Sequence, residues 1–315
     1  MKKTTILLSA LALFWSSFTI KPEMKKVDDL EGTISISGAF ALYPMAVKWG
    51  EEFKKLHPKV KFDISAGGAG KGISDALGGM VDLGAVSRDI YPEEIKKGAY
   101  SISVTKDAVI PTVNAANPNI KEILTKGIKK EVFANIYAAG VYKNWKQAGF
   151  TVSAPIHVYT RSDAAGAAEI WAKYFGKKQE DLLGVGVYGD PGLLQAVKKD
   201  PIGIGFNNIS YVYDSKTKKQ QAGIAVVPID INSNGKVDPD ENFYGSLDDI
   251  IKATADGKYP SPPARDLYFV AKNKPQKKVV VAFLKWVLTE GQKYVYESGY
   301  IKLTDTKLQA ELTKL

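Results

Sequence analysis

The feature that most constrains the fold is an alternation of short strand-like runs with amphipathic helical segments along the chain. Residues 32–37 (GTISIS) and 60–65 (VKFDIS) alternate apolar and polar side chains, whereas Met45, Trp49 and Phe53 recur at the three-to-four-residue spacing of a helix. Chains that alternate in this way form α/β folds with largely parallel sheets. We therefore expect an α/β fold.

The length allows about two domains. The chain has 315 residues, and its 45% hydrophobic content can fill two cores. Residues 156–160 (IHVYT) are strand-like and lead into a helical segment that contains Ile170 and Trp171, so the arrangement of the first unit is repeated. The Asn and Pro residues of 114–119 mark a boundary between the two units.

The first 18 residues have the layout of an export signal. Two lysines precede an apolar run from Ile6 to Trp15, and small residues follow. We assign residues 1–23 as a signal peptide and expect a periplasmic protein, with a retained anchor as the alternative. The chain has no cysteine, which excludes disulfides and a lipid-modified lipobox cysteine.

The charge balance favours an anionic ligand. Lys and Arg number 43 against 34 for Asp and Glu, a formal net charge of +9. No Arg-and-aromatic pattern indicates a nucleic-acid surface. The two histidines, His57 and His157, are interpreted as structural, and without cysteine they do not favour a catalytic triad or a zinc site. We expect no enzymatic activity.

Residues 65–72 (SAGGAGKG) approach a phosphate-binding Walker loop but fail at two fixed positions. Ser65 stands where the first Gly is required, and Gly72 stands where Ser or Thr would hold magnesium. What remains is a glycine-rich turn that leads into a helix, whose free N–H groups favour an anion. A tight turn without a ligand fits these residues equally well.

Three junctions of this kind recur, each joining small residues to the start of a helix. They are residues 37–44 (SGAFALYP), 65–72 and 161–168 (RSDAAGAA). If they meet between two lobes, one anion could receive N–H groups from several helices, while Arg88 and Arg161 supply charge-assisted hydrogen bonds. The alternative for either arginine is a surface salt bridge.

Seven segments, in order, resemble the phosphate ABC-transporter substrate-binding protein family, and together they cover nearly the whole chain after the signal. These segments are ISGAFALYPMAVKWGEEFKKLHP, SAGGAGKGISDALGGMVDLGAVSRDI, VYKNWKQAGF, VYTRSDAAGAA, GIGFNNISYVYD, ARDLYFVAKNKP and FLKWVLTEGQKYVYESGYIKL.

The resemblance implies a two-lobed periplasmic-binding-protein fold (type II) with mixed, mostly parallel sheets. Lobe 1 would comprise residues 30–110 and 265–315, and lobe 2 residues 111–264, with two crossing hinge strands near 107–114 and 267–272. It also implies a monomer that captures inorganic phosphate or a related oxyanion between the lobes. The closed form would be recognised by an ABC transporter permease, with no covalent chemistry and no required cofactor.

The same resemblance implies a set of ligand-binding residues. They are Ala39, Phe40, Ala69, Gly70, Ser87, Arg88, Arg161, Ala165, Gly166 and Ala167. The family's three anion loops are rich in Ser and Thr, but alanines replace them here. Each lost charge-assisted hydrogen bond removes about 1.5–3 kcal/mol if nothing replaces it. Another anionic small molecule is therefore an alternative ligand.

Two other functions remain as alternatives. One is an enzyme that acts on phosphate esters or nucleotides, and the other is a calcium-stabilised interaction protein with a vestigial cleft.

Selecting phosphate over sulfate needs an acceptor for the phosphate proton, for which Asp89 and Asp163 are candidates. We interpret Asp163 instead as the residue that orients Arg161.

Residues 230–241 (DINSNGKVDPDE) match the twelve-residue calcium-loop pattern. The predicted ligands of a structural Ca²⁺ are Asp230, Asn232, Asn234, Lys236 through its carbonyl, Asp238 and Glu241. Gly235 stands where the loop needs its sharp turn. The segment before the loop looks like a strand rather than a helix, and Asn-Gly also forms ordinary turns, so both interpretations are kept.

Overall fold

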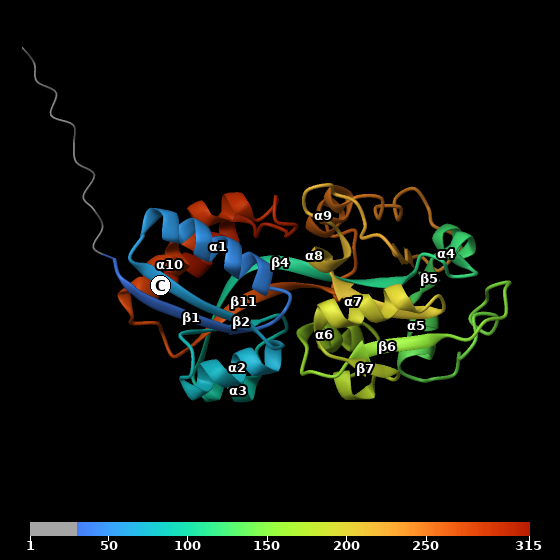
Figure 1. The fold of residues 1–315 in the computed structure, drawn as a ribbon, viewed down its shortest axis with the longest axis horizontal. Coiled ribbons are helices and arrows are strands. Elements are labelled where there is room, and N and C mark those ends of the chain that lie inside the picture. The colour runs from blue at the N-terminus through green and yellow to red at the C-terminus, as the bar shows by residue number, and fades with distance from the viewer. Residues whose placement is uncertain (1–29) are drawn as a thin grey trace, which may run out of the picture.

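The structure, a computed structural model, describes residues 30–315. Figure 1 shows two lobes side by side, with the C-terminal segment returning to the lobe that contains β1. We call this the first lobe and its neighbour the second lobe. The predicted signal peptide, residues 1–23, lies outside the described residues. Within residues 30–315, none of the helices combines the length and the apolar character needed to cross a membrane.

The first lobe is built from both ends of the described chain. Its elements are β1 (Gly32–Gly38), α1 (Tyr43–Leu56), β2 (Val60–Ala66), α2 (Ala69–Gly78), β3 (Leu83–Val86), α3 (Pro92–Lys96), α10 (Lys278–Leu288), η2 (Glu290–Tyr294) and α11 (Asp305–Thr313).

The second lobe is formed by the middle of the chain. Its elements are α4 (Ile120–Lys126), β5 (Ile128–Lys129), α5 (Lys130–Tyr137), β6 (His157–Arg161), α6 (Gly166–Tyr174), η1 (Gln179–Asp181), β7 (Val185–Val187), α7 (Gly189–Lys199), β8 (Gly203–Asn208), α8 (Ile209–Val212), β9 (Ile224–Val226), β10 (Ile229–Asp230) and α9 (Leu247–Ala255).

Two long strands, β4 (Ala99–Asn114) and β11 (Ala264–Lys272), run through both lobes. They are antiparallel neighbours at the centre of one mixed sheet, whose strand order is β2-β1-β3-β11-β4-β8-β6-β7, with β9 also paired to β4. Pairing is parallel among β1, β2 and β3 and among β6, β7 and β8. The predicted two-lobed α/β fold with mixed pairing and two crossing strands is confirmed.

The apolar core is divided between the lobes. One cluster contains Trp49 and Phe283, and the other contains Trp171 and Phe206. Along β4 the change of cluster falls between Val104 and Ala108, and along β11 it falls between Ala264 and Leu267. The β-sheet is therefore continuous across both lobes, whereas the apolar core is divided into one cluster for each lobe. The predicted residue limits of the lobes stay a prediction.

Local sequence explains how α1 is placed at the crossing. Pro44 occupies the first turn, where its missing N–H costs nothing, and Met45, Trp49 and Phe53 form the buried face. The helix ends just before Pro58, which cannot continue it. Its N-terminus follows directly from the end of β1, so the connecting loop at Ala39–Leu42 lies at the border between the lobes.

Candidate functional site

Four helices begin around one small space between the lobes. α1 and α2 come from the first lobe, and α6 and α7 come from the second. None of the four has an N-cap residue whose side chain accepts from the helix, whereas α9 and α11 are capped by Ser246 and Thr304. The N–H of Gly189 at the start of α7 is nevertheless engaged, because it donates to Asp163 at 3.1 Å. The N–H groups of a first helical turn have no acceptor within the helix. Donors that suit an anion are therefore concentrated here.

The cavity between these helix ends is closed in this structure, and the space left in it is too small for a water molecule. Its lining residues are Ala39, Phe40, Ala41, Gly68, Ala69, Ser87, Arg161, Ala165, Gly166, Ala167, Asp190 and Asn208. A ligand can therefore enter only if the lobes first move apart, and the size of the closed space does not select among small anions. Of the predicted ligand-binding residues, eight line this cavity, and Gly70 and Arg88 do not.

Gly70 lies next to the cavity and joins the lobes directly. Its N–H donates to the carbonyl of Ala164 at 2.9 Å, and a Cβ on Gly70 would lie 2.5 Å from that of Ala164. A Cβ on Gly166 would likewise lie 2.2 Å from Oγ of Ser87. The glycines in these two loops therefore allow the close approach of the lobes.

Arg161 is the cation at the cavity, and its guanidinium is held by two carboxylates. Nε and Nη2 donate to Asp163 at 2.8 and 2.6 Å, and Nη1 donates to Asp190 at 2.5 Å. Burial disfavours the charge, but Asp190 and Asp163 outweigh it and raise the pKa of Arg161. Asp163 thus orients Arg161, and backbone N–H groups must supply much of the attraction for an anion.

Arg88 is placed differently from Arg161. Its guanidinium binds both carboxylate oxygens of Glu94, at 2.9 and 2.7 Å, and lies 4.0 Å from the ring centre of Tyr91. Burial opposes the charge, and Glu94 raises the pKa of Arg88 against that effect. The structure does not bring this side chain to the cavity, so its role at the ligand stays a prediction. Asp89, the other proposed acceptor, pairs with Lys173 across the lobes.

Phe40 closes the apolar side of the cavity. Its ring centre lies 5.3 Å from Cζ of Arg161 and 5.7 Å from the ring of Tyr188, edge to face. A Cβ on Gly189 would lie 2.8 Å from Cζ of Phe40. The carbonyl of Phe40 also accepts a hydrogen bond from the hydroxyl of Tyr211 at 3.1 Å. The side chain of Phe40, a first-lobe residue, therefore packs against residues of the second lobe.

Comparison with known proteins agrees with this arrangement. A family model described as a PBP superfamily domain matches residues 26–290. The chain belongs to the PBP superfamily.

Two relatives and one solved structure illustrate the similarity. This PBP-superfamily chain is 28% identical to the phosphate-binding protein PstS of Methanocaldococcus jannaschii, over 87% of this chain and 83% of the relative. It is 26% identical to PstS of Pseudomonas aeruginosa, over 90% and 86%. An ABC-type phosphate transport receptor from Vibrio cholerae shares the fold, with a TM-score of 0.61, 21% identity and coverage of 86% and 100%. The predicted resemblance to phosphate-transport binding proteins is confirmed.

Sequence reasoning missed two charged residues beside the cavity of this PBP-superfamily protein, Asp190 and Arg265. Asp190 is fully buried near the start of α7, and Arg265, 6% exposed, lies at the start of β11. One signal could have identified Arg265. The chain has 43 basic residues, but only three are arginine, at 88, 161 and 265.

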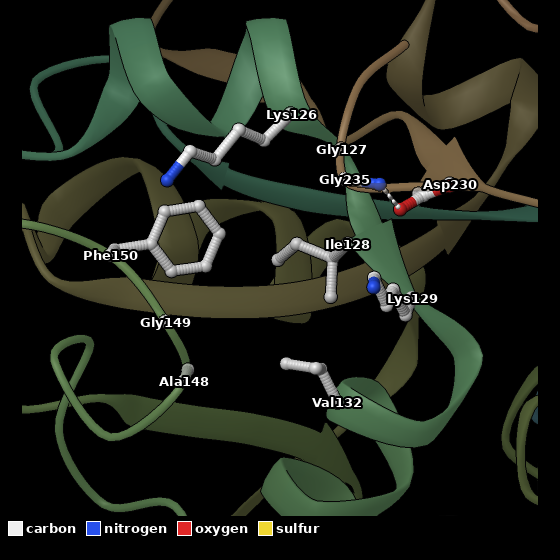
Figure 2. Close-up of a pocket in the computed structure, with 10 residues that line it drawn as sticks. All are labelled: Lys126, Gly127, Ile128, Lys129, Val132, Ala148, Gly149, Phe150, Asp230 and Gly235. Atoms are coloured by element: carbon white, nitrogen blue, oxygen red, sulfur yellow. Dashed lines mark hydrogen bonds between the residues drawn. The ribbon is translucent and has the colours of Figure 1, made fainter. Parts of the chain in front are cut away.

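The predicted calcium loop folds on its own hydrogen bonds. The carboxylate of Asp230 accepts from the N–H groups of Asn234 and Gly235, at 3.1 and 2.8 Å, the second bond being drawn in Figure 2. The carboxylate of Glu241 accepts from the N–H of Asn232, and Asp238 accepts from that residue's side-chain amide.

The same loop supplies part of the wall of a second cavity. There Asp230 and Gly235 lie across from Lys126 and Phe150 of the second lobe. Across residues 30–315, three or more His, Cys, Asp or Glu side chains nowhere form a group suited to a metal ion. Asp230, Asp238 and Glu241 thus do not form such a group, and the wider ligand set of the loop stays a prediction.

Proposed function

We propose that this PBP-superfamily protein is an exported solute-binding protein that captures inorganic phosphate, or a closely related oxyanion, for an ABC transporter. The observation that carries the proposal is the convergence of four uncapped helix N-termini and Arg161 on one narrow interlobe cavity. The names of the relatives support phosphate as the ligand. The predicted signal peptide supports export, and delivery by a monomer to a permease is part of the same proposal.

A different small anion is the second candidate, and the lining of the cavity favours it. The loops present five alanines instead of hydroxyl donors, and Arg161 is already engaged by Asp163 and Asp190. One guanidinium and two carboxylates leave this trio with one formal negative charge. A dianion would therefore depend on backbone donors, so a monoanion of similar size is the stronger competitor.

Calorimetry on protein freed of bound ligand tests the proposal. Inorganic phosphate should bind, and Arg161→Ala should abolish binding because it removes the cation and leaves Asp163 and Asp190 uncompensated. Lys285→Gln, an exposed change in α10, is the control and should bind as wild type does. Circular dichroism verifies that each variant is folded.

Two results would contradict the proposal. Heat from another small anion but none from phosphate would favour the second candidate. Unchanged phosphate affinity in Arg161→Ala, with the protein folded, would remove the cavity as the binding site.

Calcium binding by residues 230–241 stays a prediction. A bound ion would raise the melting temperature of chelator-treated protein when millimolar calcium is added, and Asp230→Asn would remove that rise. An unmoved melting temperature in the wild type would eliminate the site.

A further inference from the structure

Arg265 lies at the point where the crossing strands pass from one core to the other. Its neighbour Ala264 belongs to the second-lobe core, whereas Leu267 belongs to the first-lobe core. In the antiparallel pairing of β11 with β4, the register partner of Arg265 is Asp107. Both side chains are buried, with Nη1 of the arginine 3.5 Å from the carboxylate.

The guanidinium of Arg265 reaches both lobes. Nε donates to the carbonyl of Ser87, which follows β3 of the first lobe, at 3.3 Å. Nη2 donates to Oδ1 of Asn208, the last residue of β8 in the second lobe. Both Ser87 and Asn208 line the interlobe cavity. One buried side chain thus joins a cavity-lining residue of each lobe.

The contacts continue from Asn208 to the cation of the cavity. Nδ2 of Asn208 donates to Oδ1 of Asp190 at 2.8 Å, and Oδ2 of Asp190 accepts from Nη1 of Arg161 at 2.5 Å. We call Ser87, Arg265, Asn208, Asp190 and Arg161 the interlobe chain. Arginine can only donate, so it fixes which end of the Asn208 amide faces Asp190. The position of Arg161 therefore depends on a residue that does not line the cavity.

We propose that Arg265 is a positioning residue that couples the approach of the lobes to the orientation of Arg161, through Ser87 on one side and Asn208 on the other. The inference rests on the proposed function for its effect on phosphate affinity. Its effect on lobe closure needs no ligand.

The choice of arginine over lysine supports this role. Forty of the 43 basic residues are lysine, and only three, at positions 88, 161 and 265, are arginine. A guanidinium presents several donors in a fixed planar fork, whereas an ammonium is a compact point charge on a flexible stem. Only the planar fork of a guanidinium can contact Ser87, Asn208 and Asp107 at the same time. A lysine at position 265 would keep the charge but lose this geometry.

The first test measures closure without ligand. Small-angle X-ray scattering of ligand-free Arg265→Gln should give a larger radius of gyration than the wild type, because the link between Ser87 and Asn208 is lost. Lys272→Gln removes a positive charge from an exposed position on the same strand, β11, and should leave the radius unchanged. Calorimetric melting verifies that both variants are folded.

The second test is a double-mutant cycle on the dissociation constant for inorganic phosphate. Arg265→Gln should weaken binding about tenfold or more, Arg265→Lys should restore little of it, and Lys272→Gln should have no effect. Combining Arg265→Gln with Asn208→Ala should weaken binding no more than the larger single effect, because both act through the interlobe chain.

The outcomes separate this inference from the proposed function. Absence of phosphate binding in the wild type would contradict the proposed function, and the scattering experiment would still decide the inference. An unchanged radius of gyration in Arg265→Gln would overturn it. So would full rescue by Arg265→Lys, or effects of Arg265→Gln and Asn208→Ala that multiply independently.

Discussion

Asp107 is a buried carboxyl whose charged form is disfavoured by its surroundings. It is fully buried on β4, and burial raises its pKa to about 6 against the opposing attraction of Arg265. A carboxyl pKa above its ordinary value means that the folded state binds the proton more tightly than the unfolded state. The stability contributed by the protonated form is therefore present at low pH and lost as pH rises through about 6.

We predict that Asp107→Asn flattens the pH dependence of stability. A shift from 3.8 to about 6 corresponds to about 3 kcal/mol, lost by the wild type between about pH 4 and pH 7. The asparagine variant should lack this decline. Calorimetric melting of both proteins at several pH values measures the difference, and parallel curves would refute the assignment.

The alanines that line the cavity allow a gain-of-function prediction. Ala167 is the second residue of α6, and Ala167→Ser places a hydroxyl donor beside the free N–H groups of that helix. One added charge-assisted hydrogen bond contributes about 1.5–3 kcal/mol, so phosphate should bind about tenfold more tightly or better. Titration calorimetry measures it. Ala310→Ser at an exposed position of α11 is the control, and equal affinities in both variants would contradict the prediction.

At the scale of single residues, sequence reasoning identified most of the cavity lining but only one of its charged groups. The small residues of the loops follow strands directly and Arg161 is the last residue of β6, so position along the chain marks them. Arg265 and Asp190 act through partners distant in sequence, Asn208 and Asp107 among them, and no local pattern marks such partners. The role expected for Arg88 illustrates the same limit, because Glu94 engages its guanidinium.

At the scale of secondary-structure elements, the start of α7 requires a glycine at position 189. Gly189 has φ +70°, a left-handed conformation that favours glycine, and a Cβ there would lie 2.8 Å from the ring of Phe40. We predict that Gly189→Ala destabilises the protein by about 1 kcal/mol through backbone strain and weakens ligand binding by displacing Phe40. Gly257→Ala, also at positive φ but with open space at Cβ, is the control.

These two glycine variants separate strain from contact. Both should lower the melting temperature, because both force a side chain into a left-handed conformation. Only Gly189→Ala should raise the phosphate dissociation constant. Equal dissociation constants in the two variants would mean that the position of the Phe40 ring does not affect phosphate binding.

Most elements around the cavity could be predicted from the sequence. The apolar spacing of 45–56 and Pro44 marked α1, and the alternation of apolar and polar residues over 60–65 marked β2. The crossing strands were placed too far along the chain at their starts: β4 begins at Ala99 and β11 at Ala264. At the start of β11, Arg265 is buried and pairs with Asp107 of β4, an arrangement that the alternating pattern of a solvent-exposed strand does not indicate.

At the scale of the whole molecule, ligand binding should stabilise the closed arrangement. Phosphate that binds only the folded protein adds about 2.7 kcal/mol at a concentration 100 times its dissociation constant. We predict a rise in melting temperature that grows with phosphate concentration in the wild type and is absent in Arg161→Ala. Scanning calorimetry at graded phosphate concentrations measures it. A concentration-independent melting temperature would contradict interlobe capture.

The restriction of arginine to three buried positions has a practical consequence. Dicarbonyl reagents modify guanidinium groups and leave lysine largely untouched, so the forty lysines of this chain would not obscure the signal. Arg161 and Arg265, 5% and 6% exposed, contact residues of both lobes, so their modification should accelerate when the lobes part. The labelling rate, followed by intact-protein mass spectrometry, would then report how often the unliganded molecule opens.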